Sequence, residues 1–193
     1  NTSALTAAPL IIPNLASSAS PNGKINHAVV GTDGQGWSDL SNIATHPNVN
    51  ITAICDVDTS RMAKAAAKFP DARKYQDWRD LLESEGDRID SVQVAIPDHM
   101  HASVSIAAMK KGKHVYCEKP LAHEISEARA MGAWAKKSGV VTQMGNQIQS
   151  SIEYRSAVIL IQNGVIGKIK EVHAWAGATF PGSGRPAGED PGP

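Results

Sequence analysis

Three glycines carry the most distinctive chemical pattern in this sequence, because they stand between an apolar run and a helical pattern. They follow the apolar residues 27–30 and precede residues 37–44, where Trp, Leu, Ile and Ala recur at helical spacing. Glycine lets the backbone turn sharply and approach a ligand closely. The helix that follows directs unpaired N–H groups and the positive end of its dipole into the turn, which suits a pyrophosphate. The residues of this predicted phosphate turn are Gly31, Thr32, Gly34 and Gly36.

A carboxylate follows the turn at a spacing that extends the nucleotide hypothesis. A second apolar run ends at Asp56, 20 residues after Gly36. A dinucleotide fold places a carboxylate at this spacing to bind the hydroxyls of the adenosine ribose. Asp56 would repel a 2'-phosphate, so the expected cofactor is NAD, with NADP less favoured and Arg61 as the one nearby cation for such a phosphate. The alternative role for Asp56, capping the helix at 59–69, is weaker because Asp58 lies closer to that helix.

One residue departs from the usual glycine pattern. In the G-x-G-x-x-G pattern that begins at Gly31, Asp33 occupies the position of the second glycine, which lets the backbone approach the phosphates. Two like charges about 4 Å apart repel by roughly 1 kcal/mol in water and roughly 4 kcal/mol at an effective dielectric constant of about 20. Aspartate tolerates left-handed backbone geometry. We therefore expect the turn to keep its shape with the Asp33 carboxylate facing solvent, Gly34 to supply the close approach, and the cofactor to bind less tightly.

The elements that must position these groups alternate regularly along the chain. Predicted strands and helices follow one another with short connections, which favours parallel strands joined by right-handed crossovers. The expected fold class is α/β, a doubly wound parallel sheet of the Rossmann type with helices on both faces. The predicted strands are residues 27–30, 50–56, 72–75, 89–96, 114–117 and 140–144. The predicted helices after the first one are residues 59–69, 78–82, 101–111, 126–137 and 152–162.

Polar residues gather where the predicted strands end. Ligands of doubly wound sheets bind outside the carboxyl ends of the strands. A single polar group there is ordinary loop chemistry, because Pro, Asn and Asp favour turns, but groups after five strands on one edge indicate a site. Besides the glycines, these groups are Asp56 after the second strand, Pro97-Asp98-His99-Met100-His101 after the fourth, Glu118-Lys119-Pro120 after the fifth and Gly145-Asn146-Gln147 after the sixth.

These residues resemble the glucose-fructose oxidoreductase and inositol dehydrogenase (Gfo/Idh/MocA) family over residues 25–175. The most specific match is Cys117-Glu118-Lys119-Pro120 after a strand, preceded by the loop IPDHMHA and followed by the turn MGNQ. The resemblance implies an NAD or NADP cofactor, with Lys119 beside the nicotinamide and the reacting carbon as a catalytic or substrate-orienting cation. It also implies that Glu118 and Pro120 shape the turn of this lysine. The residues implied along the nicotinamide half of the cofactor are Pro97, Asp98, His101, Glu118, Lys119 and Asn146.

The implied chemistry agrees with these residue types. Oxidising an alcohol removes a proton and a hydride, so the site needs a base and a group that stabilises the developing alkoxide, while the nicotinamide takes the hydride. Lys119 fits the role of stabilising cation. The alternatives are that Lys119 is an ordinary surface lysine, that His101 is an ordinary residue near a helix N-terminus, and that His99 is simply exposed.

The family takes further catalytic groups from a later segment. This segment has the pattern G-x-x-x-D-x-x-x-H, and its His commonly serves as the base. The 193 residues contain no such pattern, so we expect them to lack the full catalytic site. Residues 168–176 look like the first strand of a second α+β domain, and His173 fits a strand residue better than the base. The predicted parts are a signal-like or disordered tail at 1–20, a dinucleotide-binding Rossmann domain at 21–165 and the start of a truncated substrate domain at 166–193.

Three functional hypotheses follow. The leading one is an NAD(P)-dependent oxidoreductase that transfers a hydride between a small-molecule sugar or cyclic polyol and the nicotinamide. The second keeps the fold and changes the chemistry, because some relatives are glycosidases that retain NAD and cleave a glycosidic bond through transient oxidation. The third is a non-catalytic nucleotide-binding module in which Asp33 is a genuine loss of the glycine.

Composition excludes several other classes of function. The 19 Lys and Arg residues balance 19 Asp and Glu residues, and no basic face lined with aromatic residues is evident, so we expect no nucleic-acid partner. Cys55 and Cys117 lie within or at the end of apolar runs without C-x-x-C spacing, which predicts buried thiols and no metal site. We expect the full-length protein to be a homo-oligomer.

The first residues resemble the end of a secretory signal. The apolar segment at 4–15 is interrupted by Pro9 and Pro13 and is too short to span a bilayer, and small residues with a cleavage pattern after Ala19 follow it. The basic region of such a signal is absent. We expect an exported or periplasmic protein that travels folded with its cofactor by a twin-arginine route and does not associate with the membrane. If the segment is only a tail, the expected location is cytoplasmic.

Overall fold

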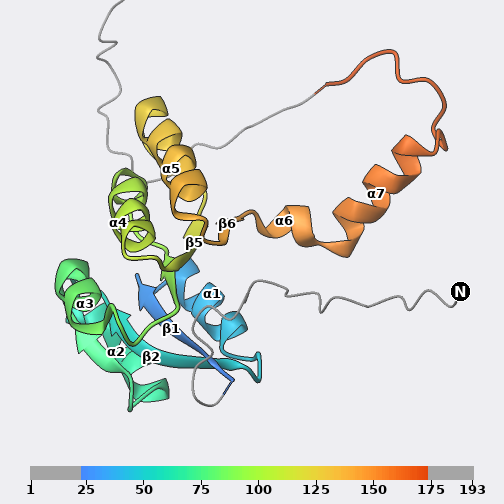
Figure 1. Cartoon of the computed structure of the whole chain (residues 1–193). Helices are drawn as coiled ribbons and strands as arrows, with labels where there is room; N and C mark the ends of the chain where they lie inside the picture. Colours follow the sequence, from blue (N-terminus) through green and yellow to red (C-terminus); the bar gives the residue numbers. More distant parts are fainter. Residues whose placement is uncertain (1–22, 174–193) are drawn as a thin grey trace, which may run out of the picture. The chain divides into compact units, whose positions relative to one another are not determined.

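The computed structural model of the chain describes residues 23–173. Contacts divide the chain into two compact units, Asn1–Asn146 and Gln147–Pro193. The described part of the first unit alternates strands and helices throughout (Figure 1). Its elements are β1 (Ile25–Val30), α1 (Gln35–Ile43), β2 (Val49–Cys55), α2 (Thr59–Lys68), β3 (Arg73–Tyr75), α3 (Trp78–Glu85), β4 (Ser91–Val94), α4 (Asp98–Lys110), β5 (His114–Glu118), α5 (Ile125–Ser138) and β6 (Thr142–Gly145).

A parallel sheet of six strands forms the centre of this unit. The strand order is β3-β2-β1-β4-β5-β6, and every neighbouring pair is parallel. The chain builds from β1 outward to β3 and then crosses to β4 on the other side of β1. Open α/β sheets bind their ligands at the carboxyl ends of the strands where the order reverses in this way. The arrangement confirms the predicted doubly wound parallel sheet of the Rossmann type.

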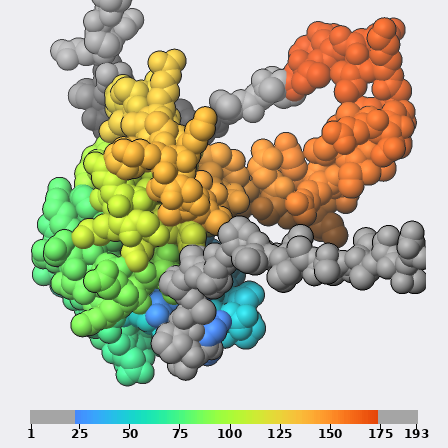
Figure 2. Space-filling model, in the orientation of Figure 1, coloured from blue at the N-terminus to red at the C-terminus, as the bar shows by residue number. Residues whose placement is uncertain are grey.

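The side chains that alternate along β1 supply two separate hydrophobic layers. Ala28 and Val30 belong to the cluster beneath α3, α4 and α5, whereas Val29 belongs to the cluster beneath α1 and α2. On the first of these faces α4 packs against α5, and the atoms of the two helices form one continuous surface in Figure 2. The sheet is thus covered on both faces around β1, which leaves its carboxyl edge for binding.

Short polar residues fix where the helices begin. The Asp58 carboxylate accepts a hydrogen bond of 2.8 Å from the Ser60 amide at the start of α2. Asp77 accepts an equivalent bond of 2.8 Å from the Arg79 amide at the start of α3. Such caps satisfy amide groups that the first helical turn leaves without partners. Because Asp58 caps α2, Asp56 is not needed as a cap, which agrees with the prediction from the spacing.

Helix α4 begins earlier than the sequence pattern predicts. It starts at Asp98 rather than at residue 101, so Asp98 and His101 belong to the first turns of a helix and not to a loop. Pro97 precedes the helix with φ −55°, close to the value that the proline ring imposes. The Asp98 carboxylate also complements the positive end of the helix dipole. These two local effects explain the earlier start.

The described part of the second unit is helical. It contains α6 (Gln147–Ser150) and α7 (Ile152–Gln162), and α7 has the predicted bounds. The Ser151 hydroxyl caps α7 by accepting a hydrogen bond of 3.2 Å from the Tyr154 amide. No residue of α7 is buried. The predicted strand at 168–176 is not formed at 168–173, where the backbone has no regular structure, and its remaining residues lie outside the described part of the chain.

Between residues 23 and 173, no helix has both the length and the apolar character needed to cross a membrane. The same residues contain no group of three or more His, Cys, Asp and Glu side chains placed to hold a metal ion.

Candidate cofactor-binding and active site

The glycine turn after β1 is built on two close backbone approaches. Gly31 has φ +92°, and a Cβ atom there would lie 1.9 Å from the carbonyl oxygen of Ala95 at the end of β4. At Gly36 in α1, a Cβ atom would lie 2.2 Å from the carbonyl oxygen of Gly31. Any larger residue at either position must therefore displace main-chain atoms. Gly34 is exposed, has φ +54° and is the N-cap of α1.

Thr32 and Asp56 join the ends of β1 and β2. Both the amide nitrogen and the hydroxyl of Thr32 donate to Asp56 Oδ2, at 3.0 and 3.1 Å. The other carboxylate oxygen, Oδ1, accepts from the Asp58 amide at 3.1 Å. A carboxylate has about four acceptor positions, so these three bonds orient Asp56 and leave capacity for a further donor. Thr32 is fully buried, whereas Asp56 is partly accessible.

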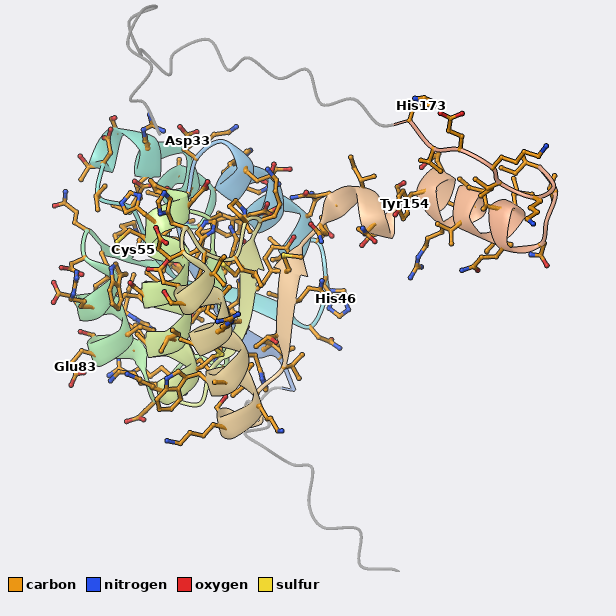
Figure 3. All side chains as sticks on the ribbon, turned by 90° about the horizontal axis from the view of Figure 1, so that it is seen from above. Asp33, His46, Cys55, Glu83, Tyr154 and His173 are labelled. Carbon is orange, nitrogen blue, oxygen red and sulfur yellow. The ribbon has the colours of Figure 1, made fainter. Side chains whose placement is uncertain are left out.

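Asp33 turns away from the domain interior and toward a basic residue of α2. The Arg61 guanidinium lies 3.6 Å from Asp33 Oδ2 and 3.7 Å from Asp58 Oδ2. The Asp33 side chain is half exposed and lies at the periphery of the domain (Figure 3). This geometry agrees with the expectation that the carboxylate faces solvent. Arg61 supplies a counter-charge that the sequence pattern did not assign to Asp33.

A cavity of about 820 Å³ opens beside this turn, at the carboxyl ends of β1, β2, β3 and β4. Four of the residues predicted to bind the cofactor line it, namely Gly31, Thr32, Asp56 and Pro97. Its other walls are residues outside the predicted cofactor-binding set, although the sequence places some of them, including Arg61, His99 and Met100, near this edge. They are Val30, Asp33, Cys55, Val57, Asp58, Arg61, Gln76, Asp77, Trp78, Arg79, Ala95, Ile96, His99 and Met100.

The missed wall from Gln76 to Arg79 follows β3. Because β3 neighbours β2 in the sheet, the carboxyl end of β3 lies next to the end of β2, which Asp56 follows. The strand order of a Rossmann half places this loop beside the ribose site. A strand of three residues, Arg73–Tyr75, leaves only a weak pattern in the sequence, and the loop after it therefore carries no clear signal.

The turn after β5 carries Lys119. The preceding Glu118 is buried, with 4% of its surface exposed, whereas Lys119 is exposed. The carbonyl oxygen of Pro120 lies 2.6 Å from Nδ1 of His101 in α4. A carbonyl oxygen only accepts hydrogen bonds, so Nδ1 of His101 must carry the proton. The buried His101 therefore anchors the turn of Lys119 to α4.

The remaining predicted residues lie at the same edge without lining the cavity. Asp98 is exposed in the first turn of α4. The Asn146 amide donates to the Met144 carbonyl oxygen at 2.9 Å, just after β6. The edge thus has two features: the cavity beside β1 and β2, and the turn that carries Lys119 after β5. Gly34, Gly36, Asp98, His101, Glu118, Lys119 and Asn146 stand outside the cavity wall.

The two cysteines are structural thiols. Both are buried and neither forms a disulfide. Burial raises the pKa of Cys55 to about 12 and that of Cys117 to about 11, and nearby carboxylates add to both shifts. A thiol is nucleophilic as its thiolate, so neither cysteine is suited to covalent catalysis. The prediction of buried thiols is confirmed.

These features fit a dinucleotide. The turn at Gly31 brings bare backbone to the edge of the cavity, α1 directs its N-terminus toward that turn, and Asp56 stands at the end of the adjacent strand. Fold and site together define a dinucleotide-binding domain of the Rossmann class.

Comparison with known proteins gives the family. Residues 25–146 match the Gfo/Idh/MocA family, described as an oxidoreductase family with an NAD-binding Rossmann fold. This match covers more than half of the 193 residues, so the chain belongs to the Gfo/Idh/MocA family and carries its NAD-binding domain. The resemblance inferred from the Glu118-Lys119-Pro120 motif is confirmed.

Individual relatives span several activities. The chain is 33% identical to levoglucosan dehydrogenase of Pseudarthrobacter phenanthrenivorans over 116 residues, 60% of this chain and 29% of the relative. It is 35% identical to a glycosyl hydrolase family 109 protein of Solibacter usitatus over 116 residues, 55% of this chain and 26% of the relative. The crystal structure of myo-inositol 2-dehydrogenase from Lactobacillus plantarum superposes with a TM-score of 0.70 and 26% identity, covering 76% of this chain and 43% of that one. The chain therefore spans less than half the length of each of these proteins.

Proposed function

We propose that the full-length protein is an NAD-dependent oxidoreductase that transfers a hydride between a sugar or cyclic polyol and the nicotinamide. The observation that carries this proposal is the presence, on one sheet edge, of a dinucleotide-sized cavity and of the Glu118–Pro120 turn with its exposed lysine. Ligands of doubly wound sheets bind at this edge. The substrate class is supported by the names of two similar proteins, levoglucosan dehydrogenase and myo-inositol 2-dehydrogenase.

The proposed roles divide between binding and chemistry. Thr32 and Asp56 hold the adenosine end, because the amide and hydroxyl of Thr32 fix the carboxylate at the cavity wall. Lys119 orients the substrate hydroxyl and stabilises negative charge on its oxygen as the proton leaves. NAD, when bound, supplies the acceptor for the hydride. We expect the general base to come from residues beyond those described, as the family pattern implies.

The proposed cofactor preference is NAD over NADP. Asp56 and Asp58 place two carboxylates at the cavity wall, where a 2'-phosphate would meet negative charge. Arg61 lies within 4 Å of Asp33 and Asp58 and is already paired with them. Fluorescence titration of the full-length protein with NADH and NADPH tests this preference. Tighter binding of NADPH would contradict it.

A glycosidase that retains NAD is the second candidate, because the chain is also similar to a glycosyl hydrolase family 109 protein. Single-turnover mixing of the NAD-loaded protein with sugars and with aryl glycosides distinguishes the candidates. Accumulation of NADH with a sugar or polyol supports the dehydrogenase, and release of the aglycone without net NADH supports the glycosidase. NAD binding with neither reaction would support a non-catalytic nucleotide-binding module.

Export and oligomeric state are further proposals. The signal-like residues 1–20 lie outside the described part of the chain. We propose that they are removed during export and that the full-length protein forms a homo-oligomer. Amino-terminal sequencing of the native protein and sedimentation analysis test these points. A native protein that retains residues 1–19, or one that sediments as a monomer, would contradict the corresponding proposal.

A further inference from the structure

A buried glutamine in β4 has no role in the site as described above. Gln93 is 0% exposed and lies in an interior strand of the sheet. Its Nε2 atom donates a hydrogen bond of 2.9 Å to the carbonyl oxygen of Gly36 in α1. A carbonyl oxygen only accepts hydrogen bonds, so this contact fixes which end of the amide faces α1. The two residues are 57 positions apart in the sequence, so the bond joins two separate elements of the fold.

The stability of the fold does not explain this glutamine. The Oε1 atom of Gln93 is buried and has no hydrogen-bond partner among residues 23–173. An unpaired polar atom in the interior lowers the free energy of unfolding. The Gly36 carbonyl oxygen does not depend on Gln93 either, because Gly36 lies within α1 and the regular helix pattern supplies an amide donor. On stability alone, an apolar side chain of similar size is expected at position 93.

Gly36 belongs to the close contact that shapes the predicted phosphate turn. It is the second residue of α1, and a Cβ atom there would lie 2.2 Å from the Gly31 carbonyl oxygen and 3.3 Å from the Ala95 side chain. Gln93 lies two residues before Ala95, and alternate residues of a strand point to the same face. Gln93 and Ala95 therefore both meet Gly36, the first through a hydrogen bond and the second through packing.

The N-terminus of α1 has backbone amides available for a phosphate. Its N-cap is Gly34, which has no side chain to cap the helix. The amides of the first turn of an α-helix have no partner within the helix. In a Rossmann fold, such amides bind the pyrophosphate of the dinucleotide, and their position depends on how the helix packs on the sheet. Gln93 does not line the cavity, so it acts on a bound cofactor only through α1.

We propose that Gln93 is a positioning residue for the pyrophosphate of the cofactor, because its hydrogen bond to Gly36 holds the N-terminus of α1 in place at the phosphate turn. The proposal rests on the proposed function only in that the cofactor is a dinucleotide. A donor that holds the helix in its binding arrangement reduces the ordering that accompanies binding. Gln93 thus contributes to the affinity for ligands with phosphates, while its unpaired Oε1 atom lowers the stability of the free protein.

The test compares Gln93→Met with the wild type in the full-length protein. Methionine has a similar length and flexibility but no hydrogen-bond donor. NADH is titrated by its fluorescence, and its displacement measures the affinities for ADP, which keeps the pyrophosphate, and for adenosine, which lacks it. Gln143→Met is the matched control, because the exposed Gln143 of β6 also donates to a main-chain carbonyl oxygen, that of Met144 at 2.7 Å.

We expect Gln93→Met to weaken the binding of NADH and ADP by about 3- to 10-fold, the size of effect that one hydrogen bond produces. Adenosine affinity should not change, because Thr32 still holds Asp56. The midpoint of urea unfolding should stay the same or rise, since the variant removes an unpaired polar atom. Gln93→Leu has a different shape and should give the same results, whereas Gln143→Met should match the wild type.

Three results would overturn the proposal. The first is an ADP affinity that Gln93→Met leaves unchanged, and the second is an equal loss of affinity for ADP and adenosine, which would indicate general damage to the domain. The third is a large fall in the urea midpoint in both Gln93→Met and Gln93→Leu, which would show that the glutamine serves stability. If the protein binds NADH but oxidises no sugar or polyol, the proposed function fails. The ADP and adenosine titrations still decide the role of Gln93 in that case, so the two failures are distinguishable.

Discussion

Thr32 and Asp56 form a bridge between the ends of β1 and β2, in which one carboxylate oxygen accepts both the amide and the hydroxyl of the threonine. This bridge lies at the wall of the cavity. The carboxylate that is proposed to recognise the ribose is therefore held in place by the phosphate turn itself. For this reason we expect binding of the adenosine ribose and binding of the pyrophosphate to be coupled.

Asp56→Ala should weaken NADH binding about 10-fold or more, because hydrogen bonds to a charged group contribute roughly 1.5–3 kcal/mol. NADPH binding should weaken much less, since the variant also removes a charge that repels the 2'-phosphate. Titration of the full-length protein with both cofactors measures the change. Asp71→Ala, at an exposed position after α2, is the control. An unchanged ratio of NADH to NADPH affinity would show that Asp56 does not select the cofactor.

The Asp33–Arg61 pair should determine the effect of the missing second glycine. Arg61→Ala should weaken NADH binding about 2- to 5-fold, because it leaves the Asp33 charge without a counter-charge, and exposed pairs contribute roughly 0.2–1 kcal/mol. Asp33→Gly should bind NADH more tightly than the wild type. In the Asp33→Gly background, Arg61→Ala should have little effect on NADH binding. The control variant Arg129→Ala should have no effect in the wild type or in the Asp33→Gly background. Equal effects of Arg61→Ala in the two backgrounds would contradict this account.

Gly31→Ala should destabilise the folded domain by about 2–5 kcal/mol, since the added methyl group meets the Ala95 carbonyl and the residue must keep a positive φ. Gly132→Ala is the matched control in α5, where a Cβ atom meets nothing within 4 Å. That change should stabilise the protein by up to about 1 kcal/mol. Urea unfolding of the two variants measures both effects. A Gly31→Ala protein with wild-type stability would mean that β1 and β4 do not approach as described.

His27 should give the protein an acid-sensitive contribution to stability. Burial lowers its pKa from 6.5 to about 4, and Nδ1 lies 2.7 Å from the Ser91 hydroxyl oxygen. The unfolded chain therefore binds the proton more readily, and stability is lost as the pH falls from 6.5 toward 4. A shift of this size corresponds to about 3 kcal/mol.

His27→Asn should remove this pH dependence, which urea unfolding between pH 7 and pH 4 measures against the wild type. The contribution of Asp39 has the opposite sign over part of the same range, because its folded pKa is raised to about 6. The double variant His27→Asn, Asp39→Asn separates the two. A wild-type slope in His27→Asn would show that His27 does not titrate on unfolding.

The parts of the site that follow from local spacing could be predicted from the sequence. Gly31 and Asp56 stand at the ends of adjacent parallel strands, so their distance along the chain indicates that they meet. The sheet class followed from the alternation of strands and helices for the same reason. Lys119 was found through its motif, which is also local.

The parts that depend on contacts between distant elements could not be predicted. Asp39 looks like a surface acid within a helical pattern, whereas the packing of α1 on the sheet leaves it only 6% exposed. Arg61 reads as an ordinary helix residue until the turn places Asp33 within 3.6 Å of it. The prediction of a strand at 168–176 is wrong at 168–173, because the alternation of apolar and polar residues along a segment does not specify a partner strand. A strand needs such a partner to satisfy its backbone groups.

The central claim is that the full-length protein oxidises a sugar or cyclic polyol at a site that includes Lys119. Single-turnover formation of NADH by the NAD-loaded protein, measured with a panel of sugars and cyclic polyols, tests it most directly. The wild type and Lys136→Ala, at an exposed position of α5, should form NADH at equal rates. Lys119→Ala should be slower by about 100-fold or more while binding NAD nearly as well, because its charge acts mainly as the alkoxide develops. Tight NAD binding without NADH formation from any member of the panel, or equal rates for Lys119→Ala and the wild type, would contradict the claim.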